Sequence, residues 1–313
     1  MTLAAGSGQG ARGIGYRLLG RRFDYLLHMR PVEWPIMAAH TALGWILAVG
    51  LEGAVKGAPA GPIALGLFAW VVCLNGGTLA INSAFDRDDG DIAYLKRPPP
   101  PPRHLFAFGL AAMVAGQLLA LLLPTGFAVA YALCFVLSVL YSVPPARLKA
   151  VAGADWLINM WGFGTLTPYA GWAVTGIAVP LPLALVMLAF CPLFASLYPL
   201  TQLYQLDEDA RRGDRTLAIR LGMTRSLDVA LGAALVAFAV FAIAGTQSGW
   251  AAEQGGPRRW AALAVALAVW LAVLIPWRAR HAGMTSGQHQ RGMYLALAAW
   301  AVTDLAVAFA WGT

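Results

Sequence analysis

The chain has 313 residues, of which 59% are hydrophobic and only 12% are charged, and its mean hydropathy is +0.64. Because a soluble domain carries about 25% charged residues, this composition excludes a soluble globular protein and indicates an integral membrane protein. The formal net charge of +7 is therefore interpreted as cationic loops on one side of a membrane, and not as a surface for nucleic acid.

Residues 1–20 contain Arg and Gly but no apolar core, so we expect a disordered cytoplasmic tail there. A single membrane domain is expected over residues 21–313. Its apolar runs are each long enough, at roughly 20 residues, to cross a bilayer as a helix. They lie near residues 34–51, 62–84, 105–123, 127–143, 156–174, 181–204, 229–244, 260–277 and 294–311. The sequence therefore predicts an all-α membrane protein with about nine transmembrane helices.

The basic residues indicate how these spans are oriented. With the N-terminus inside, 19 of the 22 Lys and Arg residues fall on the inner side, and only Lys56, Arg258 and Arg259 fall outside. This asymmetry follows the positive-inside rule. It predicts a multi-pass protein of the cell inner membrane with a cytoplasmic N-terminus and, for nine spans, a C-terminus on the opposite side.

Two short acidic stretches, residues 82–91 (NSAFDRDDGD) and 202–214 (QLYQLDEDARRGD), end two of the apolar runs. Together they hold eight of the 15 carboxylates. Asn82 and Asp86 are four residues apart and share a helical face with Gly90, while Asp89 and Asp91 flank that face. Carboxylate and amide oxygens at membrane depth, where acids are costly, are typical of a Mg²⁺ site completed by substrate phosphate.

The second stretch repeats this pattern, since Gln202, Gln205 and Asp209 are spaced by three and four residues. The two faces are predicted to meet in one oxygen-rich pocket on the cytoplasmic side. The alternative is that both stretches are ordinary solvated loops. Basic residues lie near each stretch and in the loop between the fourth and fifth spans. They favour a phosphate-bearing substrate, because Arg and Lys bind phosphate oxygens. These basic residues include Arg97, Arg147, Lys149 and Arg215.

The segments NSAFDRDDGD followed by KRP, YSVPPARLK, and YQLDEDARRGDRTLAIRLG resemble, in that order, three motifs of the UbiA superfamily of intramembrane prenyltransferases. These are the first aspartate motif, the central loop and the second aspartate motif. The resemblance implies an all-helical fold around a central cavity with a cytoplasmic cap, and Mg²⁺ that holds an isoprenoid diphosphate. Gly90 and Gln205 depart from the family pattern, because acids often stand at these positions.

Carried onto this sequence, the resemblance implies catalytic roles for Asp86, Asp209, Arg147 and Lys149. The predicted metal ligands are Asn82, Asp86, Asp89, Asp91, Gln205 and Asp209. The predicted substrate-binding residues are Asn82, Arg97, Tyr141, Asn159, Gln202, Tyr204, Gln205 and Arg215.

The resulting function is a Mg²⁺-dependent transfer of a prenyl group from an allylic isoprenoid diphosphate to an aromatic or lipid-like acceptor. Aromatic side chains would stabilise the allylic cation; the candidates are Trp161, Phe163, Tyr169, Trp172, Phe194, Tyr198 and Tyr204. One alternative is a membrane-bound terpene cyclase, which uses the same diphosphate site without an acceptor. A second is a carrier of an anionic lipid or metabolite.

Overall fold

The computed structural model describes residues 10–86, 95, 97–204, 206 and 216–313. Helices dominate this part of the chain, and it contains no β-strand. The first half comprises α1 (Ala11–Leu19), α2 (Phe23–His28), α3 (Trp34–Lys56), α4 (Ala60–Leu67), α5 (Gly77–Asp86), α6 (Leu105–Ala120) and α7 (Thr125–Ser142). The second half comprises α8 (Ala154–Asn159), α9 (Thr167–Ala173), α10 (Leu181–Gln202), α12 (Leu217–Gln247), α13 (Gly256–Arg280) and α14 (Ser286–Gly312).

Two long helical segments contain a π-helical stretch. The segment η3 (Phe68–Gly76) joins α4 to α5, and η5 (Met160–Leu166) joins α8 to α9. Three short 3-10 turns flank the bundle helices, at Gly20–Arg22, Pro31–Glu33 and His281–Gly283. A fourth, Leu148–Ala150, lies in the loop after α7. Because π-helical turns occur frequently at functional sites, the space between η3 and η5 is a candidate location for a functional site.

Seven helices in the described part of the chain are long and apolar enough to cross a membrane. They are Pro31–Lys56, Ala60–Asp86, Thr125–Ser142, Leu181–Gln202, Leu217–Gln247, Gly256–Gly283 and Ser286–Gly312. Helix α6 is apolar but has only 16 residues, and the predicted fifth span is divided among α8, η5 and α9. The all-α membrane fold is confirmed, and the predicted number of nine spans is approximate.

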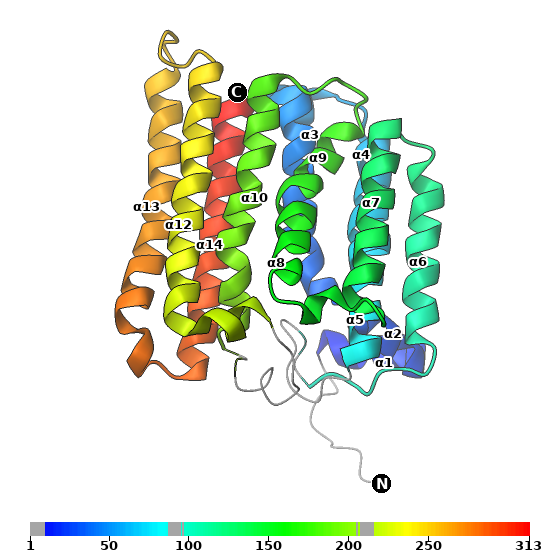
Figure 1. Cartoon of the computed structure of the whole chain (residues 1–313). Coiled ribbons are helices and arrows are strands. Elements are labelled where there is room, and N and C mark those ends of the chain that lie inside the picture. The colour runs from blue at the N-terminus through cyan, green and yellow to red at the C-terminus, as the bar shows by residue number, and fades with distance from the viewer. Residues whose placement is uncertain (1–9, 87–94, 96, 205, 207–215) are drawn as a thin grey trace.

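The helices form two packed groups that meet at α3 and α9 (Figure 1). One hydrophobic cluster joins α10, α12, α13 and α14 to one side of α3, and a second joins η3, α6, α7 and α9. At the junction α3 and α9 approach with their backbones nearly in contact. A Cβ atom on Gly44 would lie 1.7 Å from the carbonyl oxygen of Pro168, and one on Gly171 would lie 1.7 Å from that of Thr41. Such small residues let membrane helices pack closely.

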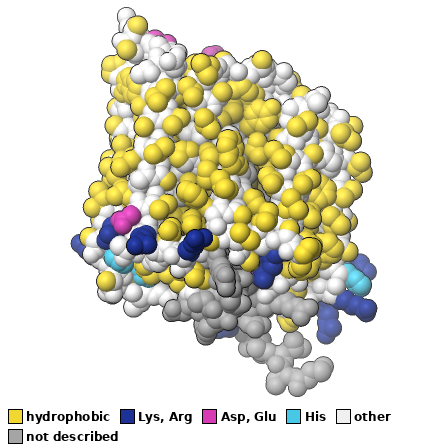
Figure 2. All heavy atoms as spheres, in the orientation of Figure 1, with side chains coloured by type: hydrophobic (Ala, Val, Ile, Leu, Met, Phe, Trp, Pro, Cys, Tyr) yellow, Lys and Arg dark blue, Asp and Glu magenta, His cyan; other side chains and the backbone are white. Residues whose placement is uncertain are grey.

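The surface of the bundle is apolar along its sides and basic at one end. Figure 2 shows hydrophobic side chains over the sides, with Lys and Arg gathered near the end where α5 and α10 finish. Leu122 and Leu305 are more than 70% exposed, which suits a lipid-facing surface. Helix α1 lies at this basic end and the carboxyl terminus at the other (Figure 1). The residues 1–20 expected to be a disordered tail include α1, which is helical; residues 1–9 lie outside the described part of the chain.

Candidate functional site

The last turn of α5 carries the first two predicted site residues, Asn82 and Asp86. Their spacing of four residues places both on one face of the helix, as the sequence predicts. The helix ends at Asp86, whose side chain is only 13% exposed. A carboxylate this well buried at a membrane face requires cationic or hydrogen-bonding partners.

The loop after α7 supplies those partners. Helix α7 ends at Ser142, and the chain then passes through a cis peptide bond between Pro144 and Pro145. Arg147 has a left-handed backbone with φ of +34°, which is a costly conformation for a residue other than glycine. Strained residues of this kind cluster at functional sites. Lys149 follows within the 3-10 turn Leu148–Ala150.

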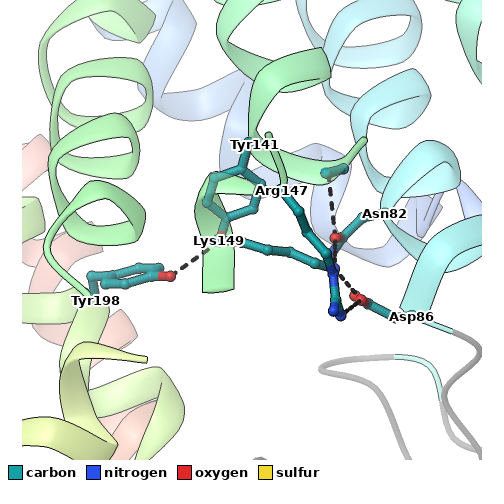
Figure 3. A network of polar contacts seen from close by, with 7 residues as sticks. Asn82, Asp86, Tyr141, Arg147, Lys149 and Tyr198 are labelled. Atoms are coloured by element: carbon teal, nitrogen blue, oxygen red, sulfur yellow. Dashed lines mark hydrogen bonds and ion pairs between the residues drawn. The ribbon is translucent and has the colours of Figure 1, made fainter. Parts of the chain in front are cut away.

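The two basic side chains converge on α5 (Figure 3). Lys149 Nζ donates a hydrogen bond of 2.7 Å to Asn82 Oδ1 and also forms an ion pair with Asp86 Oδ1. Arg147 Nη2 reaches the same Asp86 oxygen at 3.4 Å, and Ser142 Oγ lies 3.4 Å from Asn82 Oδ1. The Lys149 side chain is 10% exposed, whereas Arg147 is 35% exposed. The predicted grouping of Asn82, Asp86, Arg147 and Lys149 therefore forms in the structure.

A cavity extends from Asn82 into the bundle. The cavity and its open mouth together enclose about 780 Å³, solvent space included. None of the described residues that line it is charged. The lining residues are Met37, Trp70, Leu74, Asn75, Thr78, Leu79, Asn82, Cys134, Leu137, Ser138, Tyr141, Ile158, Asn159, Gly162, Phe163 and Thr167. The site thus has a charged mouth and a neutral interior whose walls include both π-helical segments.

Two tyrosines lie beside the mouth. The hydroxyl groups of Tyr141 on α7 and Tyr198 on α10 are 3.0 Å apart (Figure 3). Tyr141 and Asn159 line the cavity, as does Phe163, whose ring stacks on Phe194 at a centroid distance of 5.2 Å. Of the aromatic residues proposed to stabilise a cation, Phe163 therefore contacts the cavity directly. Trp70 also lines it, although the sequence analysis did not single it out.

A second polar network fixes both ends of the segment that carries the second acidic stretch. Asp155 is fully buried and accepts hydrogen bonds from Gly153 N at 2.8 Å, Leu217 N at 3.2 Å and Gln202 Nε2 at 3.4 Å. Gln202 Oε1 in turn accepts one from Ala218 N at 3.3 Å. Because Gln202 ends α10 and Leu217 begins α12, this network holds the two points between which the second stretch lies.

The remaining predicted residues are distributed as follows. Arg97 is exposed and left-handed, with φ of +47°, and its carbonyl accepts a 3.0 Å hydrogen bond from Arg12 Nη2. Tyr204 packs on the larger hydrophobic cluster, and its carbonyl accepts a hydrogen bond from Ser286 Oγ. Five predicted site residues and Gly90 lie outside the described part of the chain. The five are Asp89, Asp91, Gln205, Asp209 and Arg215.

Ser142 and Asn75 are among the polar residues at the site that were not predicted. Ser142 contacts Asn82, and Asn75 lines the cavity from η3. Asn75 stands seven residues before Asn82, which is two helical turns on the same face. That spacing is the sequence signal that could have identified it. In the described part of the chain, no cluster of three or more His, Cys, Asp or Glu side chains could hold a metal ion.

Comparison with solved structures places this fold among known membrane proteins. A UbiA homolog from Archaeoglobus fulgidus bound to DMAPP and Mg²⁺ has a TM-score of 0.67 and 20% sequence identity, over 89% of this chain and 98% of that one. The same homolog bound to GPP and Mg²⁺ has a TM-score of 0.66 and 20% identity, over 89% and 99%. Digeranylgeranylglyceryl phosphate synthase has a TM-score of 0.66 and 14% identity, over 92% and 97%. At these identities the likeness concerns the fold alone.

The sequence itself assigns the family. No curated protein matches it significantly. Residues 43–298, however, match the UbiA prenyltransferase family, and this match spans well over half of the chain. It includes Asn82, Asp86, Arg147, Lys149 and the cavity residues of η3 and η5. The protein therefore belongs to the UbiA prenyltransferase family.

Proposed function

We propose that this protein is a Mg²⁺-dependent intramembrane prenyltransferase that ionises an allylic isoprenoid diphosphate and transfers the prenyl group to an acceptor. The observation that carries this proposal is the convergence of Lys149 and Arg147 on Asn82 and Asp86 at the mouth of a neutral cavity. A charged head group suits the mouth and an apolar chain suits the interior. The related UbiA homolog structures contain DMAPP or GPP with Mg²⁺, which supports this substrate class.

The oxygen atoms at the mouth fit a magnesium ion. Lys149 Nζ bridges Asn82 Oδ1 and Asp86 Oδ1, so these two oxygens already converge on one positive charge. Mg²⁺ is typically bound by one or two carboxylates together with waters and substrate phosphates. We infer that Asn82 and Asp86 hold it, with Asp89, Asp91, Gln205 and Asp209 as further candidate ligands. When bound, the ion would neutralise charge on the diphosphate.

The basic residues then act on the leaving group. Lys149 and Arg147 exchange part of their contact with Asp86 for the diphosphate oxygens, where charge-assisted hydrogen bonds are strongest. As the bond between C1 and oxygen breaks, the electron pair leaves with the diphosphate, and these two cations stabilise the developing negative charge. Arg97, Gln202 and Tyr204, at the same end of the bundle, remain proposed substrate-binding residues. Arg215 also remains proposed.

The other product of ionisation, the allylic cation, stays in the cavity and contacts its wall. The allylic cation lies beside Trp70, Tyr141 and Phe163, whose ring faces attract positive charge. Because the lining is neutral and mostly apolar, water has few partners there and quenching by water is disfavoured. An electron-rich atom of the acceptor attacks C1, and the adduct then loses a proton. The acceptor belongs to the aromatic or lipid-like class, with the charged mouth on the cytoplasmic side of the cell inner membrane.

The proposal is tested with purified protein, Mg²⁺ and allylic diphosphates of several chain lengths, with and without a lipid extract or phenolic acceptors. We expect diphosphate release and a prenylated product that requires the acceptor. Asp86→Ala and Asp209→Ala should each lower the rate by about 10²-fold or more. Asp228→Ala is the matched control, because Asp228 is an exposed carboxylate paired with Arg278 at 2.6 Å, and Asp228 is not among the cavity-lining residues.

The outcomes separate the alternatives. Near-normal Mg²⁺-dependent release by either the Asp86 or the Asp209 variant contradicts the site assignment. A cyclic hydrocarbon or alcohol formed without acceptor identifies a terpene cyclase. Absence of turnover, together with uptake of the diphosphate into vesicles, identifies a carrier.

A further inference from the structure

Asn75 is a polar residue deep in the cavity that the diphosphate site does not use. It lies near the end of η3, on the helical face that leads to Asn82 and Asp86. Seven residues separate it from Asn82, which corresponds to about 10 Å along the helix axis. Asn75 is therefore about 10 Å deeper in the bundle than the charged mouth. Its side chain is 5% exposed.

The amide of Asn75 has no protein partner for its donor group. Asn75 Nδ2 is buried and forms no hydrogen bond with any residue that the structure describes. A neighbouring polar group on the same wall is satisfied, because Thr78 Oγ1 donates to the Leu74 carbonyl at 2.8 Å. A buried donor without a partner is destabilising. Such a cost is tolerated where a ligand supplies the missing partner.

The surroundings of Asn75 restrict what that ligand can be. An isoprenoid chain contains no hydrogen-bond acceptor, so the chain of the first substrate does not satisfy the amide. The described lining contains no Lys, Arg or His, so a carboxylate or phosphate placed there would be a buried charge without a counter-ion, which is strongly unfavourable. A neutral hydroxyl or carbonyl oxygen satisfies the amide without that penalty.

We propose that Asn75 binds a neutral oxygen of the second substrate, and that the cavity therefore selects an uncharged acceptor such as a phenol, quinol or alcohol. This inference rests on the proposed prenyl transfer. With its oxygen at Asn75, the acceptor shares the inner part of the cavity with the prenyl chain. Its reactive atom then faces the allylic cation near Asn82.

The test compares Asn75→Leu with Thr41→Val. Thr41 is a buried residue outside the cavity lining, and its hydroxyl already donates to the Met37 carbonyl at 2.7 Å. The protein is loaded with Mg²⁺ and an unreactive thio-analogue of geranyl diphosphate. Binding of a methylated hydroquinone and of 4-hydroxybenzoate is then measured by calorimetry. We expect the Leu variant to weaken hydroquinone binding about tenfold, which corresponds to about 1.4 kcal/mol, and the Val variant to bind like the wild type. The wild type should bind hydroquinone more tightly than 4-hydroxybenzoate.

A second readout separates ligand binding from a structural role. Because the Leu variant removes an unsatisfied amide, its unliganded melting temperature should equal or exceed that of the wild type. Asn75→Ser provides a second, smaller substitution and should also weaken hydroquinone binding. Three results overturn the inference: unchanged hydroquinone binding by the Asn75 variants, tighter binding of the carboxylate, or no hydroquinone binding by the wild type. Failure of the proposed function itself is recognised separately, as absence of diphosphate release from geranyl diphosphate and Mg²⁺ by the wild type.

Discussion

His40 on α3 and Asp304 on α14 form a pair that also contacts η5, a segment of the cavity wall. The contribution of this pair to stability can be measured directly. His40 Nδ1 lies 3.0 Å from Asp304 Oδ1, and Nε2 lies 3.3 Å from the carbonyl oxygen of Gly164 in η5. In an α-helix that carbonyl would accept from the N–H of residue 168, but residue 168 is proline and has none. His40 Nε2 supplies a donor for this carbonyl. Because a carbonyl only accepts, Nε2 is the donor to Gly164, while Nδ1 shares a hydrogen bond with Asp304 Oδ1.

The expected loss of stability depends on which polar groups each substitution deprives of a hydrogen-bond partner. His40→Leu removes the partner that His40 provides for the Asp304 carboxylate, which is 13% exposed, and for the Gly164 carbonyl. A buried polar group that loses its partner costs about 1–3 kcal/mol. Asp304→Leu costs less, because His40 keeps its bond to Gly164. Asp304→Asn costs least, since an amide still donates to Nδ1. Interhelical hydrogen bonds in membranes average about 0.6 and reach about 1.7 kcal/mol, and this pair should lie at the upper end.

The assay is reversible unfolding in mixed micelles for the wild type, both Leu variants, the double Leu variant and Asp304→Asn. We expect the destabilisation to decrease from His40→Leu to Asp304→Leu to Asp304→Asn, with a coupling energy of about 1–2 kcal/mol in the double-mutant cycle. Additive effects, or a larger loss for Asp304→Leu than for His40→Leu, would refute the reasoning. His40→Leu should also lower the yield of prenylated product per diphosphate released, because η5 carries Phe163 into the cavity.

Three further predictions concern the mouth, the basic end of the bundle and the helix junction. Lys149→Met should lower kcat/KM for diphosphate release about 10²-fold and Lys149→Arg should lower it less, while removal of Mg²⁺ with a chelator should abolish release until the ion is restored. Burial lowers the pKa of His28 from its ordinary value of 6.5, so the folded protein keeps it neutral and the unfolded chain takes up the proton first. Stability should therefore fall as the pH drops below about 6.5, and His28→Gln should flatten this dependence in thermal melts. Gly44→Val should destabilise the protein by about 3 kcal/mol or more, because the added Cβ would overlap the carbonyl of Pro168. Gly61→Ala should be tolerated, because nothing lies within 4 Å of its Cβ position. Unfolding measurements on the two variants test this difference.

The positions of the spans could be predicted because hydropathy reports them directly. The predicted runs 34–51, 127–143 and 181–204 correspond to α3, α7 and α10 with shifts of a few residues. The placement of Asn82 and Asp86 on one helical face was also predictable, because the two residues are four positions apart. Helix α6 is shorter than a typical span, and the fifth run is interrupted by η5. Hydropathy alone does not detect either feature, because it is insensitive to backbone geometry.

Contacts between helices far apart in sequence could not be predicted. His40 and Asp304 are separated by 264 residues, and their pairing depends on how α3 and α14 are rotated about their axes. In the same way, the Asn75 amide is unsatisfied because none of the described residues packed around it provides a hydrogen-bond acceptor. Local patterns determine which face of a helix is polar, but only the packed bundle determines which polar groups remain without a partner.

The charge balance at the mouth restricts how the two substrates of the proposed reaction are bound. Among the described residues that meet there, Lys149 and Arg147 carry two positive charges and Asp86 carries one negative charge. This set favours an anion, and Asn82 adds only a neutral oxygen. A divalent cation would raise the excess of positive charge further unless more carboxylates joined it. Under the proposed mechanism, those acids must come from the two acidic stretches, and the diphosphate itself completes the neutralisation. The metal and the allylic diphosphate should therefore bind with mutual dependence, each tighter in the presence of the other.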